Sequence, residues 1–121
     1  MKVIRKSETA LQDATGSPIF EGGRVGRRPL VGGDASAYFN FFIVEFAAGA
    51  RNKLHTHTSD QILYVTKGRG LVGTESETYE VEEGDTAFIP AGEKHWHGAA
   101  EDSDFAHIAL VHPDSVTELH A

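Results

Sequence analysis

Cysteine is absent from this chain of 121 residues, and tryptophan and methionine occur once each. Without thiols the protein can form no disulfide, no thiolate nucleophile and no cysteine-ligated zinc site. Long apolar runs are also missing. No stretch approaches the roughly 18 apolar residues of a membrane-spanning helix, and residues 1–13 contain no apolar segment of the secretory-signal type. We therefore expect a cytoplasmic protein with no membrane partner.

Basic residues are few in this chain. Lys and Arg number 11 against 18 Asp and Glu, which gives a formal net charge of -7. A nucleic-acid-binding protein concentrates Lys and Arg on one face, whereas the densest basic cluster here contains only Arg24, Arg27 and Arg28. These residues are too few to bind a phosphate backbone, so nucleic acid is excluded as a partner. The acidic balance favours solubility.

Long helical periodicity is absent as well, and short segments rich in aromatic and β-branched residues take its place. Strands are predicted for residues 38–46, 61–66, 86–89 and 105–111. Glycine-containing turns are predicted at residues 67–70 and 82–85, and bulged edge strands and loops over residues 16–33. The last eight residues, 114–121, are expected to form one helical turn or a frayed end.

Many short strands joined by glycine turns indicate an all-β sandwich or barrel. The length of the chain is that of one domain. We expect residues 1–15 to form an N-terminal arm and residues 16–121 to form the β-barrel.

Seven histidines are the most informative residues. His55 and His57 are two positions apart, as are His95 and His97, and side chains two apart on a strand point to the same side. Imidazoles side by side in a barrel interior are costly when charged and need partners when neutral. A divalent metal ion that binds their lone pairs removes this cost. This spacing alone is compatible with two interpretations, a pair of metal ligands or a pair of structural histidines.

The residues around these histidines favour the metal. Glycines, histidines and a proline recur at fixed spacing in two segments. The first segment contains Gly49, His55, His57, Gln61 and Gly68. The second segment begins after 15 intervening residues and contains Gly84, Pro90, Gly92 and His95. Together they resemble the two-part motif of the cupins, in which the first part supplies two histidines and usually a glutamate and the second part supplies another histidine. This resemblance covers residues 49–99. It implies a small single-domain cupin, a jelly-roll-like double-stranded β-helix barrel, with one divalent metal ion per chain.

Two positions depart from the cupin pattern. The usual glutamate is Gln61, and the asparagine that often closes the second part is Ala99. The amide oxygen of Gln61 can coordinate a hard divalent ion, and the alternative is a site of three histidines and water. Neutral ligands leave the charge of the ion uncompensated, which favours Lewis-acid or acid/base chemistry over dioxygen activation.

A narrower resemblance rests on residues 90–100 together with the first-part ligands. This pattern is similar to a cupin subgroup that includes the bacterial manganese-dependent hydroxynitrile lyases. The resemblance implies a metal site formed by His55, His57, Gln61 and His95. Manganese is the expected ion, and iron, nickel, cobalt and zinc also suit mixed nitrogen and oxygen ligands.

The same subgroup places two further histidines beside the metal. By motif position these are His97 and His107, which the resemblance implies as general acid/base residues. The alternative for His107 is a buried structural histidine. Asn52 and Val111 stand where the subgroup has threonine and glutamine, so the polar groups around a substrate differ.

Three functions are open on this basis. The leading one is a metal-dependent enzyme that performs Lewis-acid-assisted lyase or isomerase chemistry, such as hydroxynitrile-lyase-like carbon–carbon cleavage, on a small oxygenated molecule. The alternatives are an iron-dependent dioxygenase and a non-catalytic module that binds or senses a small molecule. Because cupin barrels commonly pair, the resemblance also implies a homodimer.

Overall fold

A computed structural model describes residues 1–120. Its elements are short, and nearly all of them are strands: η1 (Lys6–Glu8), β1 (Gln12–Asp13), β2 (Phe20–Glu21), β3 (Val25–Val31), β4 (Asn40–Phe46), β5 (Arg51–Asn52), β6 (His55–His57), β7 (Gln61–Gly73), β8 (Thr78–Glu82), β9 (Thr86–Ile89), β10 (Trp96–Ala99), β11 (Phe105–Val111) and β12 (Thr117–Leu119). The part of the chain that the structure describes contains no helix long and apolar enough to cross a membrane.

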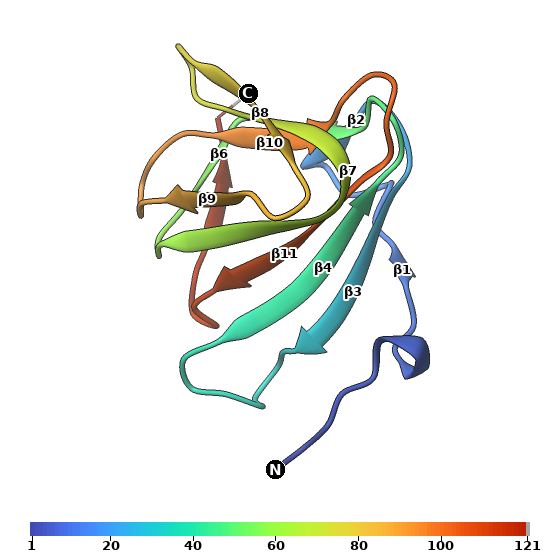
Figure 1. Ribbon diagram of the computed structural model, residues 1–121. Helices are drawn as coiled ribbons and strands as arrows, with labels where there is room; N and C mark the ends of the chain where they lie inside the picture. Colours follow the sequence, from blue (N-terminus) through green and yellow to red (C-terminus); the bar gives the residue numbers. More distant parts are fainter. Residues whose placement is uncertain (121) are drawn as a thin grey trace.

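Ten strands form one strongly curved sheet that wraps around a central space (Figure 1). Its order is β1-β3-β4-β11-β7-β10-β5-β2, and β8 and β9 both pair with β7. The pairings are antiparallel, including the separate pair of β12 and β6. The predicted all-β barrel is therefore confirmed.

β7 is the longest strand, and it corrects one sequence-based expectation. The turn predicted at residues 67–70 is wrong, because the strand continues to Gly73. Its first half pairs with β11 and β9, and its second half pairs with β10 and β8. Gly68 permits the bend between the halves: its φ is 72°, and a Cβ there would lie 1.9 Å from the carbonyl oxygen of Asp104. The glycine marks a bend within a strand, not the end of one.

Inward-facing side chains of these strands build the core. Val44, Phe46 and Phe105 are at most 4% exposed and belong to one hydrophobic cluster. Gln61 and His107 are buried on the same inner faces of β7 and β11. The packing that closes the barrel thus also fixes the position of these two polar side chains.

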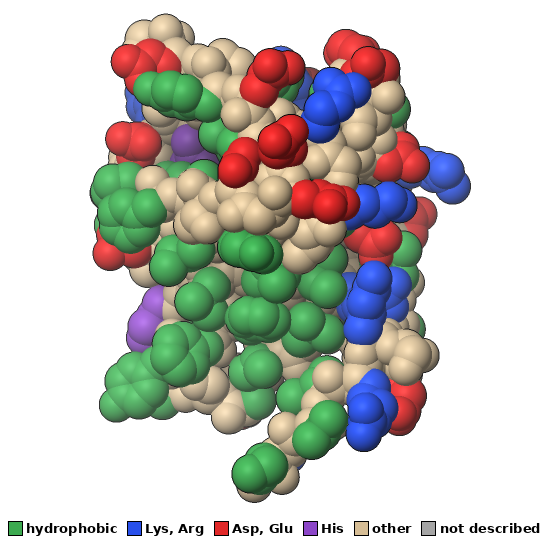
Figure 2. Space-filling view, in the orientation of Figure 1, with side chains coloured by type: hydrophobic (Ala, Val, Ile, Leu, Met, Phe, Trp, Pro, Cys, Tyr) green, Lys and Arg blue, Asp and Glu red, His purple; other side chains and the backbone are tan. Residues whose placement is uncertain are grey.

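The outer face of the sheet is apolar as well. Ile62, Tyr64 and Phe88 are 39%, 46% and 60% exposed, and Ile62 lies directly opposite Phe88 on one side and Leu110 on the other. Figure 2 shows hydrophobic side chains gathered over the lower half of the barrel and acidic side chains mainly above them. The homodimer implied by the resemblance stays a prediction.

Short strands near both ends of the described chain pair with other strands. β12 pairs with β6, and the backbone N–H of His120 donates to the carbonyl of Leu54 at 3.0 Å. The helical turn or frayed end expected over residues 114–121 is therefore wrong for the part that the structure describes, and residue 121 lies outside it. At the other end, β1 pairs with β3, so the last residues of the expected arm lie in the sheet.

Gly68→Ala is expected to destabilise the protein by about 3 kcal/mol, because a side chain at positive φ costs about 1–2 kcal/mol and the collision with the Asp104 carbonyl adds to it. Gly84→Ala is the matched control, since Gly84 has a φ of 90° but open space around its Cβ position. It should cost only about 1 kcal/mol. Urea unfolding of the two variants and the wild type measures the difference. Equal losses in the two variants would contradict the role assigned to Gly68.

Candidate metal and proton-transfer site

Three imidazoles meet where β6 approaches the residue that precedes β10. His55 and His95 form an isolated antiparallel bridge, in which each backbone N–H donates to the other's carbonyl, at 2.9 and 3.0 Å. Directly opposed residues of this kind bring their side chains together on one side of the sheet. The ring centroids of His55 and His95 are 4.2 Å apart, and that of His57 lies 4.8 Å from the first and 5.2 Å from the second.

Hydrogen bonds hold each of these rings by its Nδ1 atom. Nδ1 of His55 lies 2.6 Å from the carbonyl oxygen of Lys53, and Nδ1 of His95 lies 2.9 Å from that of Glu93. A carbonyl can only accept, so Nδ1 carries the proton in both rings. Nδ1 of His57 lies 2.9 Å from the hydroxyl oxygen of Thr117 on β12. These contacts leave the Nε2 lone pair of each ring available to bind a metal ion. Hydrogen bonds at Nδ1 orient histidine ligands in the same way in known metal sites.

Gln61 begins β7 beside these rings and is 4% exposed. Its carbonyl Oε1 is buried and has no hydrogen-bond partner among residues 1–120, and the same holds for Nε2 of His57 and His95. Leaving such groups unpaired costs about 1–3 kcal/mol each. A divalent metal ion can accept lone pairs from nitrogen and oxygen together. These side chains therefore fit such an ion.

Burial keeps the same imidazoles neutral. Desolvation lowers the pKa of His55 to about 3 and the pKa of His57 to about 4, and it also lowers the pKa of His95. At neutral pH their lone pairs are therefore free of protons, as metal binding requires.

His97 belongs to a second grouping. One ring nitrogen from each of His55, His95 and His97 lies within 4.8 Å of the others, which makes these three residues a possible metal site. Both ring nitrogens of His97 already have partners, however: Nε2 lies 3.0 Å from the amide nitrogen of Asn52, and Nδ1 lies 3.0 Å from Nε2 of His107.

Asn52 sets the proton positions of the His97–His107 pair. Its Oδ1 accepts the backbone N–H of His97 at 2.8 Å, so its amide NH2 group faces the same ring, with the amide nitrogen 3.0 Å from Nε2 and 3.4 Å from Nδ1. The shorter contact favours Nε2 as the acceptor, which places the ring proton on Nδ1, where Nε2 of His107 accepts it. His107 is fully buried, and desolvation lowers its pKa to about 4.

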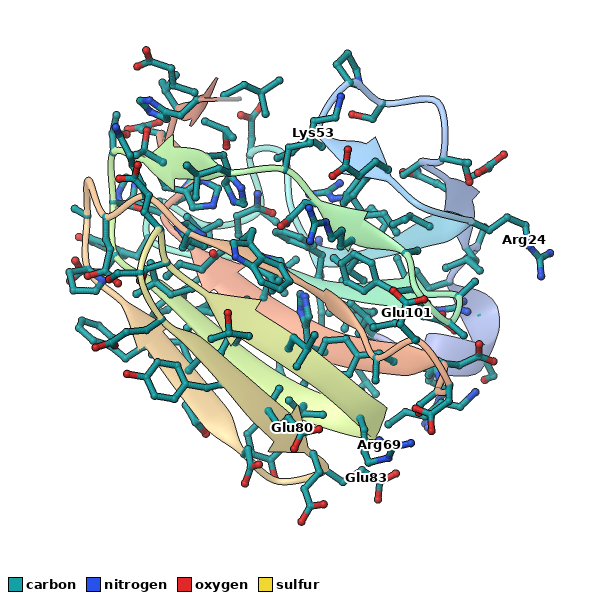
Figure 3. All side chains as sticks on the ribbon, turned by 90° about the horizontal axis from the view of Figure 1, so that it is seen from above. Arg24, Lys53, Arg69, Glu80, Glu83 and Glu101 are labelled. Carbon is teal, nitrogen blue, oxygen red and sulfur yellow. The ribbon has the colours of Figure 1, made fainter. Side chains whose placement is uncertain are left out.

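One cavity of about 310 Å³ connects most of these groups. Its polar lining includes His55, His57, Gln61, His97 and His107, and its apolar lining includes Phe42, Val44, Ala109 and Val111. His95 instead lines a second cavity, of about 410 Å³, beside Trp96. Charged side chains labelled in Figure 3, such as Arg24, Arg69 and Glu83, point away from the barrel.

The structure thus brings together all six residues predicted for the site: His55, His57, Gln61, His95, His97 and His107. It also adds residues that spacing did not indicate. Thr117 and the carbonyls of Lys53 and Glu93 hold the rings, and Asn52 orients His97. Of these, only Asn52 drew attention in the sequence, as a departure from the lyase pattern.

Comparison with known proteins shows the family and the fold of this chain. The family described as the Cupin domain matches residues 42–111. An (R)-mandelonitrile lyase from Granulicella tundricola is 43% identical over 68 residues, which are 55% of this chain and 52% of the lyase. An uncharacterised protein from Methanocaldococcus jannaschii is 44% identical over 48 residues, or 39% of this chain and 38% of that protein. The matched part of this chain thus spans about half, or less, of the length of these relatives.

Solved structures share the barrel over the whole chain. A cupin-like protein from Thermotoga maritima has a TM-score of 0.82 and 27% identity, covering 100% of this chain and 90% of that one. The polyketide cyclase RemF from Streptomyces resistomycificus has a TM-score of 0.87, with coverage of 100% and 86%, but only 18% identity, so it is similar in fold alone. Because the family match covers more than half of its residues, the chain belongs to the cupin family.

Proposed function

We propose that this protein is a metal-dependent enzyme of the lyase type, which breaks or forms a carbon–carbon bond next to an oxygen atom of a small molecule. One observation carries the proposal: two sets of buried imidazoles lie in contact but have different partners. Nε2 of His57 and Nε2 of His95 have no partner among the described residues, whereas His97 and His107 are hydrogen-bonded to each other and leave only Nδ1 of His107 unpartnered. The first set suits a metal ion and the second suits proton transfer. The likeness to an (R)-mandelonitrile lyase supports the choice of a lyase reaction.

The metal ligands in this proposal are His55, His57, Gln61 and His95. Manganese, or another divalent ion bound there, would polarise a substrate oxygen as a Lewis acid. All four ligands are neutral, so the charge of the ion would stay uncompensated and would favour an anionic group in the cavity.

Proton transfer falls to His97 and His107. Burial lowers the pKa of His97 well below its usual value and that of His107 to about 4, so both rings are neutral at pH 7. A neutral imidazole can take the proton of a substrate hydroxyl while the adjacent carbon–carbon bond breaks and its electron pair leaves with the departing carbanion. The Nδ1 proton of His97 can then move toward His107, which spreads the positive charge over both rings. Return of the proton to the carbanion restores the neutral pair.

Asn52 is the residue that most affects this role. Its amide donates to Nε2 of His97, the atom that would receive the proton. A substrate must therefore displace this contact before proton transfer. This single contact favours a second candidate function, a non-catalytic module that binds a small molecule in the same cavity. The iron-dependent dioxygenase stays a prediction.

The test is cleavage of 2-hydroxynitriles by manganese-loaded protein, measured as aldehyde release. His97→Gln is expected to lower kcat/KM by about 100- to 10,000-fold, the contribution of a general base, while metal content stays unchanged. His120→Gln, a change at an exposed histidine, is the control and should keep full activity. Unaltered activity after replacement of both His97 and His107 would contradict the proposal. Tight binding without turnover would support the binding module instead.

The buried imidazoles also make stability depend on pH. A histidine of the unfolded chain titrates near pH 6.5, whereas His107 titrates near pH 4 in the folded protein. Between these values the unfolded chain binds more protons, so stability present above pH 6.5 is lost as the pH falls. Between its folded and unfolded pKa values, each such ring can change the free energy of unfolding by up to about 1.4 kcal/mol per pH unit.

Urea unfolding of metal-free protein at pH 7, 6 and 5 checks this expectation. The free energy of unfolding should decrease over this range, and it should decrease less steeply in His107→Gln. His120→Gln should follow the wild type. A free energy that is the same at pH 7 and pH 5 would be the contrary result.

A further inference from the structure

Arg27 is the feature of the cavity that the proposed chemistry does not use. It lies on β3 directly opposite Val44 of β4, and Val44 lies opposite His107 of β11. Side chains in one row across a sheet share a face, so Arg27 points to the same interior as His107. Strands are about 4.8 Å apart, which places the two backbones about 10 Å from each other. Arg27 and His107 both line the 310 Å³ cavity.

The guanidinium of Arg27 has no counter-ion. Its ζ carbon lies over the Phe42 ring, 4.0 Å from the ring centre, a cation–π contact that holds the group against the cavity wall. Among residues 1–120 no carboxylate lies within ion-pair distance of it, whereas its neighbour Arg28 pairs with Glu45 at 3.3 Å on the opposite face. Stacking uses the face of a guanidinium and leaves the N–H edge free to bind two oxygen atoms.

The cavity is also unusual in its charge. The chain has 18 acidic residues and a net charge of -7, yet no Asp or Glu of the described residues lines this cavity. Arg27 is half-buried, and desolvation lowers its pKa, although an arginine stays charged at neutral pH. A half-buried cation without a partner carries a desolvation cost that an anion would relieve.

We propose that the cavity binds a small carboxylate, with the carboxylate group on Arg27 and an oxygen-bearing carbon at the histidines. A single planar guanidinium matches the two oxygens of one carboxylate. The described residues offer no helix N-terminus here, which is the usual partner of a phosphate. The position of the second group rests on the proposed function. The preference for an anion at the β3 end of the cavity rests on Arg27, and its dependence on Arg27 separates it from any attraction by a bound ion.

Calorimetric titration of manganese-loaded protein with mandelate and with mandelamide, its uncharged isostere, tests this inference. Wild-type protein should bind mandelate at least about tenfold more tightly, the effect of a charge-assisted pair of hydrogen bonds. Arg27→Gln should reduce the preference by at least about tenfold, the part that the guanidinium supplies, and Arg27→Lys should keep part of it. Arg24→Gln changes an exposed arginine three residues before Arg27 and should leave the preference for mandelate intact.

Equal affinity for mandelate and mandelamide, a preference unchanged in Arg27→Gln, or no binding of mandelate, lactate or glycolate would each overturn the inference. Tighter binding of inorganic phosphate than of mandelate would overturn the choice of a carboxylate. The result is separable from the proposed function, because no turnover is needed. A preference for mandelate that depends on Arg27 in a protein without lyase activity would support the inference and contradict the function. Lyase activity without any preference for mandelate would contradict the inference and support the proposed function.

Discussion

A buried cluster of neutral imidazoles is the constraint on which this structure depends. Nitrogen lone pairs inside a barrel need partners, because burial of an unpaired polar group costs free energy. The structure meets this need in two ways. Around His55 and His95 the Nδ1 atoms are held by backbone carbonyls and the Nε2 lone pairs are left to converge. At His97 both ring nitrogens are bonded within the protein.

The pairing of the strands places the side chains of this cluster next to one another. The His55–His95 bridge sets two rings opposite each other, and β12 covers β6 so that Thr117 reaches His57. β7 crosses from one half of the barrel to the other and carries Gln61 at its first residue. Because Gly68 allows that crossing, a residue far from the histidines contributes to their placement. Of the described Lys, Arg, Asp and Glu side chains, Arg27 alone lines the cavity, so a chain of net charge -7 has a positive group in its interior.

The sequence predicted the fold class, and strand alternation drew attention to the histidine pairs at 55/57 and 95/97, because alternation is a local property. The roles of Gln61 and His107 came from the resemblance to the cupins. The sequence could not predict the groups that orient these side chains. The bond between His57 and Thr117 joins residues 60 positions apart, and that between Asn52 and His97 joins residues 45 apart. Such partners become visible only once the pairing of the strands is known. Gly68 was misread as a turn because glycine at positive φ occurs in turns and in bent strands alike. Arg27 was dismissed with the other basic residues, since the sequence does not reveal which of three arginines faces inward.

In the proposed metal site, His57 and Gln61, and not His97, bind the ion together with His55 and His95. Titration of metal-free protein with manganese chloride, in the wild type and in His57→Ala and His97→Ala, tests this assignment most directly. The account predicts about one ion per chain in the wild type, a loss of affinity of at least about tenfold in His57→Ala, and unchanged affinity in His97→Ala. Loss of binding in His97→Ala with binding retained in His57→Ala would contradict it, as would a wild-type protein that binds no ion.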